Sequence, residues 1–138
     1  MPTQHKNKTF AALLAVLAGG LGVHRFYLRG KLDKLGLLHV CAIPLCGMIY
    51  GLAPHADWFF KILPMLLSYI AAFIEALVIG TTSDEQWDAR HNAGSGTTSS
   101  SNWPLALLLV ATLMLGATVV IATMARLFDL LYTGGAYG

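Results

Sequence analysis

The chain has 138 residues, of which 56% are apolar and only 12% are charged, and its formal net charge is +2 at pH 7. A typical soluble domain has about 45–50% apolar and about 25% charged residues, so water would solvate this chain poorly. The mean hydropathy is +0.62, and the apolar residues lie in long runs. The composition therefore argues against a soluble protein or a nucleic-acid-binding protein and indicates a one-domain integral membrane protein.

The apolar runs define four candidate membrane segments, judged against the roughly 20 residues that a helix needs to cross the hydrocarbon core. They cover residues 9–28, 35–53, 58–80 and 103–132. The first run is short for a span and contains Gly19, Gly20 and Gly22, which could turn it back to its starting side. We predict an all-α, polytopic transmembrane helical protein with about four membrane segments, and a re-entrant first segment is the alternative.

The polar region between the third and fourth runs divides into two parts. Ser83 followed by Glu85 and Gln86 fits a capping box, which predicts a short interfacial helix over residues 84–91. Residues 93–102 are rich in Gly, Ser and Thr, and we predict a flexible polar linker there. Residues 1–92 would then form one membrane module, loosely tethered to the C-terminal helix.

Two further features concern the membrane segments themselves. Pro44 lies inside the second apolar run and is expected to kink it. Aromatic residues at the segment ends are expected to anchor the chain at the membrane interface. These residues are Tyr27, Trp58, Trp87 and Trp103.

The first apolar run ends in a specific motif, Gly-Gly-x-Gly-x-His-Arg-Phe-Tyr. Its residues are Gly19, Gly20, Gly22, His24, Arg25, Phe26 and Tyr27. The motif resembles the first half of the two-transmembrane (TM-two) domain family, whose second helix closes on an acidic residue among aliphatic ones. The run 69–79, with Glu75 where Asp is usual, resembles that closing helix.

The resemblance covers roughly residues 8–92, with an insertion, because about 40 residues separate the two motifs. Arg29 also interrupts the step from leucine to glycine that follows the motif. The resemblance implies a small membrane module, and it brings no substrate with it.

Small residues in the first two runs have the spacing that lets helices approach closely in lipid. They are Ala11, Ala15, Ala18, Gly19 and Gly22 in the first run, and Gly47 and Gly51 in the second. Such spacing favours helix packing, because association in a bilayer depends on close van der Waals contact. The alternative is that the glycines only loosen marginal helices.

Glu75 is the most informative single residue. An ionised carboxylate among aliphatic side chains costs several kcal/mol unless it finds a cation, a donor or water. Arg25 is the expected partner, because it follows the first helix and belongs to the same family motif. The alternatives are that Glu75 reaches the interface or lines a proton or ion pathway.

No motif for catalysis, phosphate binding or cofactor binding is present in the sequence, so we predict no catalytic residue and no cofactor. His24 and His39 are candidate metal ligands, but only Cys41 stands near His39, and a spacing of two does not suit a helix. We therefore predict no metal site.

The predicted function is a non-enzymatic membrane module that acts by helix–helix association with itself or with a larger membrane complex. The alternative is a small transport or channel subunit with a polar path near Glu75 and Arg25, and an intramembrane enzyme is a third class. The expected partner is the lipid bilayer, with no nucleic acid, and the expected location is a bacterial inner membrane. The cations of residues 25–34 favour a cytoplasmic loop, which places both termini outside if all four segments span.

Overall fold

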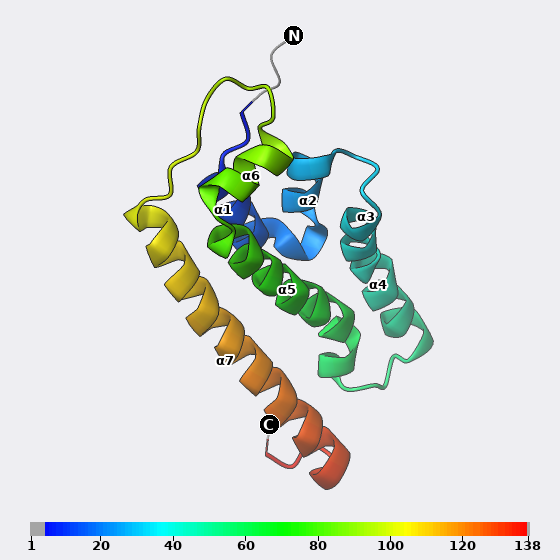
Figure 1. The fold of residues 1–138 in the computed structure, drawn as a ribbon. Helices are drawn as coiled ribbons and strands as arrows, with labels where there is room; N and C mark the ends of the chain where they lie inside the picture. The colour runs from blue at the N-terminus through cyan, green and yellow to red at the C-terminus, as the bar shows by residue number, and fades with distance from the viewer. Residues whose placement is uncertain (1–4, 138) are drawn as a thin grey trace.

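The structure is a computed structural model that describes residues 5–137, and all of their regular secondary structure is helical. The first four residues of the predicted module 1–92 lie outside the described part. The elements in chain order are α1 (Lys8–Ala18), the 3₁₀ turn η1 (Gly19–Leu21), α2 (Val23–Arg29), α3 (Lys34–Val40), α4 (Ala42–Leu52), α5 (Trp58–Thr81), α6 (Asp84–His91) and α7 (Trp103–Thr133), as Figure 1 shows. The predicted all-α fold is confirmed.

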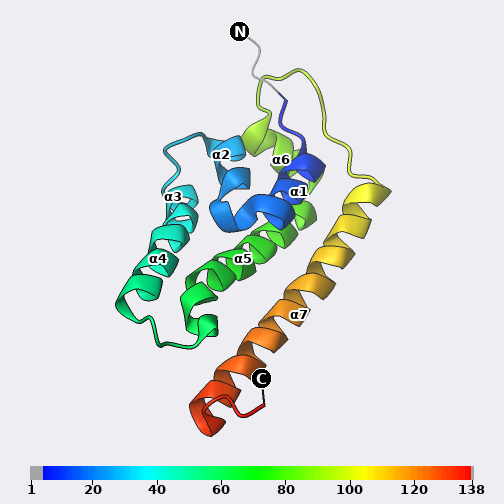
Figure 2. The same ribbon diagram turned by 180° about the vertical axis from the view of Figure 1, so that it is seen from behind.

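Three segments of the described chain are long and apolar enough to cross a membrane. They are Lys34–Leu52, Trp58–Thr81 and Trp103–Thr133. Helix α5 is central, because it contacts α1, α4 and α7, and Figures 1 and 2 show these helices arranged around it. The polytopic architecture is therefore confirmed, with three long spans and one shorter apolar helix.

The first apolar run folds as a hairpin and not as a straight span. Helix α1 leads into η1, and α2 then packs back against α1. The backbone N–H of Asn7 donates to the hydroxyl of Tyr27 at 3.1 Å, and the ammonium of Lys6 donates to the carbonyl of Leu28. The start and the end of the run therefore lie side by side, as the re-entrant alternative requires.

Gly22 makes the turn of this hairpin possible. Its φ of 72° lies in the left-handed region, which residues with a Cβ rarely adopt. A Cβ at this position would also lie 2.6 Å from the carbonyl oxygen of Gly36 at the start of α3. The glycine thus provides both the reversal and the close approach of α3.

The second apolar run divides into two helices, and the break lies three residues before Pro44. Cys41 separates α3 from α4, whereas Pro44 lies in the first turn of α4. Proline has no N–H to donate, and its ring crowds the carbonyl four residues earlier, which here belongs to Val40. The helix is therefore interrupted at Cys41, upstream of Pro44, and the kink itself stays a prediction.

Helix α7 packs along α5 although a long loop connects it to α6. A Cβ on Gly80 would lie 2.2 Å from the Leu109 side chain, so α5 and α7 approach closely at this point. Leu105 and Thr112 are buried at the same contact. The C-terminal helix is therefore packed against the rest of the fold and not only tethered to it.

The segment 93–102 has no helix or strand, but its second half is attached to α6. The backbone N–H and the hydroxyl of Ser101 donate to Asp84 at 2.7 and 2.6 Å. Ser99 donates to Asp88 in the same way, at 2.6 Å for both bonds. This attachment differs from the free linker that its composition suggests.

Helix α6 covers the start of α1. Trp87 on α6 is 2% exposed, and its indole N–H donates to the carbonyl of Lys6 at 2.9 Å. The ammonium of Lys8 pairs with Asp84 and donates to the carbonyl of Thr82 at 2.8 Å. Trp87 is therefore a packing residue and not the interfacial anchor that the sequence suggests.

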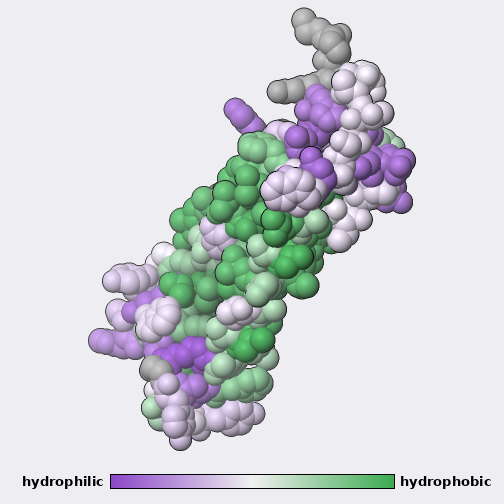
Figure 3. All heavy atoms as spheres, turned by 90° about the vertical axis from the view of Figure 1, so that its left-hand side faces the viewer, coloured by the Kyte–Doolittle hydropathy of each residue, from purple (hydrophilic) through white to green (hydrophobic). Residues whose placement is uncertain are grey.

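The charged residues gather at the two ends of the molecule, with an apolar band between them (Figure 3). Seven of the nine Lys and Arg residues lie at the end that carries the hairpin and α6: Lys6, Lys8, Arg25, Arg29, Lys31, Lys34 and Arg90. Lys61 and Arg126 lie at the opposite end, where Arg126 pairs with Asp57 at 3.0 Å. Because cytoplasmic ends of membrane proteins are enriched in Lys and Arg, this distribution favours a cytoplasmic hairpin end.

This orientation changes the predicted position of the N-terminus. The earlier expectation placed both termini outside because it assumed that residues 9–28 cross the bilayer. The hairpin returns this run to its starting side, so the N-terminus lies on the same side as the loop after α2. We therefore expect a cytoplasmic N-terminus and an external C-terminus.

Cysteine labelling in intact cells tests this orientation. In a chain with Cys41→Ser and Cys46→Ser, His5→Cys should not react with a membrane-impermeant thiol reagent until the cells are permeabilised. Ala56→Cys, in the loop between α4 and α5, should react in intact cells. Equal labelling of both positions in intact cells would show that the first run crosses the membrane.

Hydrogen exchange tests the attachment of residues 98–102 to α6. The Lys8 ammonium, with the hydroxyl and N–H of Ser101, lowers the pKa of Asp84 from 3.8 to about 2. The stabilisation from this carboxylate is therefore complete above about pH 4 and is lost as the pH falls toward 2. Asp84→Asn should speed exchange at the Ser101 amide at neutral pH, whereas Glu85→Gln on the same helix should not. Unchanged exchange in Asp84→Asn would mean that this contact does not hold the loop.

Candidate functional site

Glu75 lies on the face of α5 that points into the protein. Ser68, Ala72, Ala76 and Ile79, which share this face by helical spacing, are all buried. Thr81 ends the helix six residues after Glu75. The carboxylate is therefore held within the helix bundle, near the end that carries most of the cations.

Arg25 on α2 is bonded to the Glu75 carboxylate. Its Nε lies 2.9 Å from Oε1 and 2.8 Å from Oε2, and Nη2 also donates to Oε1. Charge-assisted bonds of this kind are about twice as strong as bonds between neutral groups. The contact that the sequence predicts between these two residues is confirmed.

Arg25 also faces a second carboxylate. Its Nη1 lies 3.5 Å from Oδ2 of Asp33, and the same carboxylate accepts from the Gly36 N–H at 2.8 Å to cap α3. In the structure, Arg25 connects α5 through Glu75 to the start of α3 through Asp33.

His24 approaches the same carboxylate from α2. Its ring is 1% exposed, and its Nε2 bonds to Oε2 of Glu75. Its Nδ1 is buried and has no hydrogen-bond partner among the described residues. A neutral ring with its proton on Nε2 satisfies this geometry, because a proton on Nδ1 would have no acceptor.

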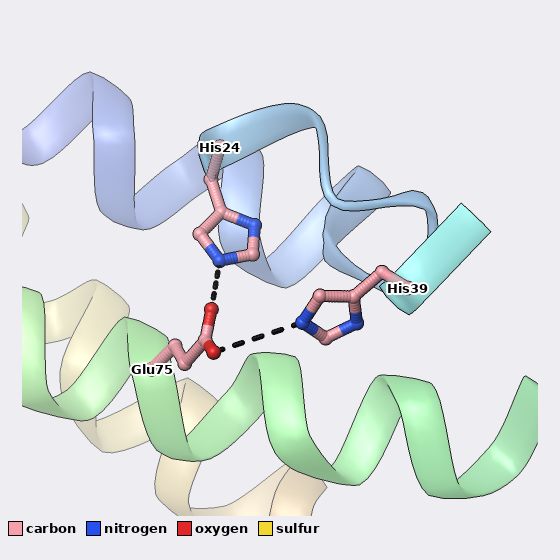
Figure 4. Close-up of side chains that lie close together, drawn as sticks. All are labelled: His24, His39 and Glu75. Carbon is pink, nitrogen blue, oxygen red and sulfur yellow. Dashed lines mark hydrogen bonds and ion pairs between the residues drawn. The ribbon is translucent and has the colours of Figure 1, made fainter. Parts of the chain in front are cut away.

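His39 on α3 completes the cluster that Figure 4 draws. The Ser68 hydroxyl donates to the carbonyl of Gly20 at 2.7 Å, so its oxygen must accept from Nδ1 of His39, also at 2.7 Å. The Nε2 of His39 then faces Oε1 of Glu75 at 3.7 Å, beyond a hydrogen bond. A proton or a cation at this nitrogen would lie against the carboxylate.

Two imidazoles and a carboxylate are also a ligand set that Zn²⁺ and Fe²⁺ accept. The ligand atoms of His24, His39 and Glu75 all lie within 4.8 Å of one another. However, Arg25 already donates to both oxygens of Glu75, and a divalent ion would compete with it there. His24 also lacks the acceptor on its second nitrogen that metal-binding histidines usually have. We therefore interpret the cluster as an ion pair with two supporting histidines.

Sequence reasoning did not find the role of His39. The signal was present in α5, where Ser68 and Glu75 are seven residues apart and so lie on one face. Two polar groups on one face of a membrane helix require polar partners on the helix that faces them. His39 is the polar residue in the apolar run that packs there.

The glycines and aromatic residues of the motif place this cluster. A Cβ on Gly19 would lie 2.4 Å from Cβ of Ala72, and a Cβ on Gly20 would lie 2.4 Å from the Tyr69 ring, so both let the turn press against α5. The Phe26 ring fills the space beside Gly36. Tyr27 packs edge-on against Phe10, with 5.4 Å between the ring centroids.

The predicted packing residues separate into two groups. Ala11 and Ala15 are buried in the core, in line with α1 packing on α5, and Ala18 is half-buried. Gly47 and Gly51 on α4 are exposed, and a Cβ at either position would have no atom within 4 Å. The small residues of the first run are therefore used within the chain, and those of α4 are not.

Two cavities share Glu75 as a wall. A groove of about 650 Å³ lies between α3–α4 and α5 and is mostly apolar, with His39 and Ser68 on its inner side. A second cavity of about 300 Å³ lies under α6, where Arg25, Arg29 and Arg90 line it. The carboxylate thus stands between an apolar groove and a basic pocket.

A bundle of apolar helices with one buried charge cluster defines a small polytopic membrane protein. The TM2 domain family model matches residues 4–53. The "Uncharacterized membrane protein YozV" of Bacillus subtilis (strain 168) is 33% identical over 87 residues, which cover 63% of this chain and 82% of that protein. The chain therefore belongs to the TM2 domain family, as the motif predicts.

The family match covers α1 to α4 and ends before Glu75. The resemblance of α5 to the family's closing helix therefore stays an interpretation. No solved structure matches the chain.

A double-mutant cycle tests the coupling between Glu75 and Arg25. Glu75→Gln and Arg25→Gln should each lower stability in detergent by about 2 kcal/mol, because each removes charge-assisted bonds from a half-buried cluster in which Arg25 keeps Asp33 and Glu75 keeps His24. The double variant should cost clearly less than the sum. Arg29→Gln is the matched control, since its side chain is 61% exposed, and it should change stability little. Additive losses in the double variant would show that the two charges do not interact.

Proposed function

We propose that this protein is a non-enzymatic membrane module that acts by helix–helix association, with itself or with a larger membrane complex. The observation that carries the proposal is the empty face of α4 at Gly47 and Gly51. Small residues four apart let a second helix approach closely, and packing is what drives association in lipid. This face has the spacing for such a contact and lacks a partner within the described chain.

The surroundings of this face support the proposal. Its neighbours on α4 are large and apolar, and Ile43, Met48 and Leu52 are all at least half exposed. The polar groups inside the bundle already have partners there, since His24 and Arg25 bond to Glu75 and His39 bonds to Ser68. The B. subtilis relative supports placing the module in a bacterial inner membrane.

Site-specific photo-crosslinking in cells tests the association. A photoreactive side chain at Met48 should give adducts of higher mass, and the mass identifies either a second copy or another protein. Gly47→Leu with Gly51→Leu should reduce the adduct severalfold without lowering thermal stability, because neither position contacts the rest of the chain. The matched probe is Leu113, an exposed residue of α7.

Comparison with the Leu113 probe also shows which result would contradict the proposal. If Met48 gives no more adduct than Leu113, or if the leucine substitutions leave the yield unchanged, the α4 face is not an association surface. Ala111→Leu on α7 adds the same side chain at an exposed position and should have no effect.

One observation favours the second candidate, a transport or channel subunit. Glu75 lines both the apolar groove and the basic pocket, and Nε2 of His39 faces it at 3.7 Å. Ionisable groups inside a membrane often mark proton or ion paths. Proton flux into liposomes that Glu75→Gln abolishes, while the protein stays folded, would favour this candidate over association.

A further inference from the structure

The apolar groove lies between two segments that are expected to cross the membrane. Its walls are α3–α4 on one side and α5 on the other, and both are candidate membrane spans. Leu38, Ala42 and Leu45 line the first wall, and Leu67 and Ala71 line the second. A cavity between two spans that is lined by such side chains takes its occupant from the bilayer.

The dimensions of the groove suit an extended chain. The wall from Leu35 to Ile49 is roughly 20 Å long at 1.5 Å per residue. A volume of about 650 Å³ spread over that length describes a long, narrow groove. An unbranched acyl chain fits both this shape and this apolar lining.

The end of the groove at Leu35 lies beside exposed cations. Lys34 directly precedes Leu35, and Lys31 lies in the loop before it. Both lysines are exposed, and neither forms an ion pair with a described residue. Lysines next to a membrane span attract anionic headgroups.

We propose that this groove binds one acyl chain of an anionic phospholipid, whose phosphate lies at Lys31 and Lys34. The chain runs along α3 and α4 toward Ile49, and the polar headgroup stays at the cation-rich end. The site is separate from the Gly47 and Gly51 face, since neither glycine lines the groove. The inference therefore does not depend on the association that we propose for α4.

Native mass spectrometry of the delipidated, full-length protein in detergent tests this site. Phosphatidylglycerol and phosphatidylcholine with identical acyl chains are the two probes. The protein should bind one phosphatidylglycerol more tightly than one phosphatidylcholine. Lys31→Gln with Lys34→Gln should weaken phosphatidylglycerol binding roughly tenfold or more and leave phosphatidylcholine unchanged.

Matched variants test the lysines at the headgroup end and the apolar groove separately. Arg90→Gln removes an exposed cation from the same end, outside the groove, and should bind as the unmodified chain does. Ala71→Leu and Leu45→Phe fill the groove from opposite walls and should weaken binding of both lipids. Ala111→Leu and Leu113→Phe make the same changes on the exposed face of α7 and should have no effect.

Three lipid-binding results would overturn the proposal. They are equal binding of the two lipids by the unmodified chain, a lysine double variant that behaves like Arg90→Gln, and groove-filling variants that behave like their α7 controls. Two independent filling variants guard against misfolding, because Leu45 is about half exposed and tolerates a larger side chain more readily than Ala71. A second copy of the chain bound in place of lipid, and lost in Leu45→Phe, would also contradict it.

Discussion

The arrangement of this small protein depends on one half-buried carboxylate. Glu75 stands on a membrane helix, where an unpaired charge is costly, and its oxygens bring Arg25 and His24 from α2 and face His39 on α3. Arg25 then reaches Asp33 at the start of α3. The cluster therefore joins three helices that lipid alone would not hold together. The glycines of the TM2 motif allow this by letting the turn lie directly on α5.

Part of this arrangement was predictable, because lipid removes most alternatives. The long apolar runs could only become helices, and a carboxylate among aliphatic side chains required a cation. Arg25 was the natural partner, since the motif places it after a helix that packs through small residues. The capping box likewise predicted α6, which begins at Asp84 and ends at His91. In each case a local chemical requirement left few solutions.

Other features depend on contacts between distant segments, which no local pattern encodes. The hairpin of residues 9–28 is revealed by the contact between Lys6 and Leu28. It moves the expected position of the N-terminal residues to the opposite side of the membrane. The role of His39 requires pairing it with the polar face of α5, because its partners Ser68 and Glu75 lie 29 and 36 residues away along the chain. The polar loop after α6 is attached because its serines bond to carboxylates on α6. Its composition alone indicates a free linker and does not show these bonds.

The central claim is that Glu75 is an ionised partner of Arg25 inside the membrane. Magic-angle-spinning NMR of the isotope-labelled protein in lipid bilayers tests it most directly. The account predicts the carbon chemical shift of a carboxylate at Glu75 and a through-space correlation between that carbon and the Arg25 guanidinium nitrogens, which lie within hydrogen-bond distance of its oxygens. The shift of a neutral carboxylic acid at Glu75, with no correlation to Arg25, would contradict it.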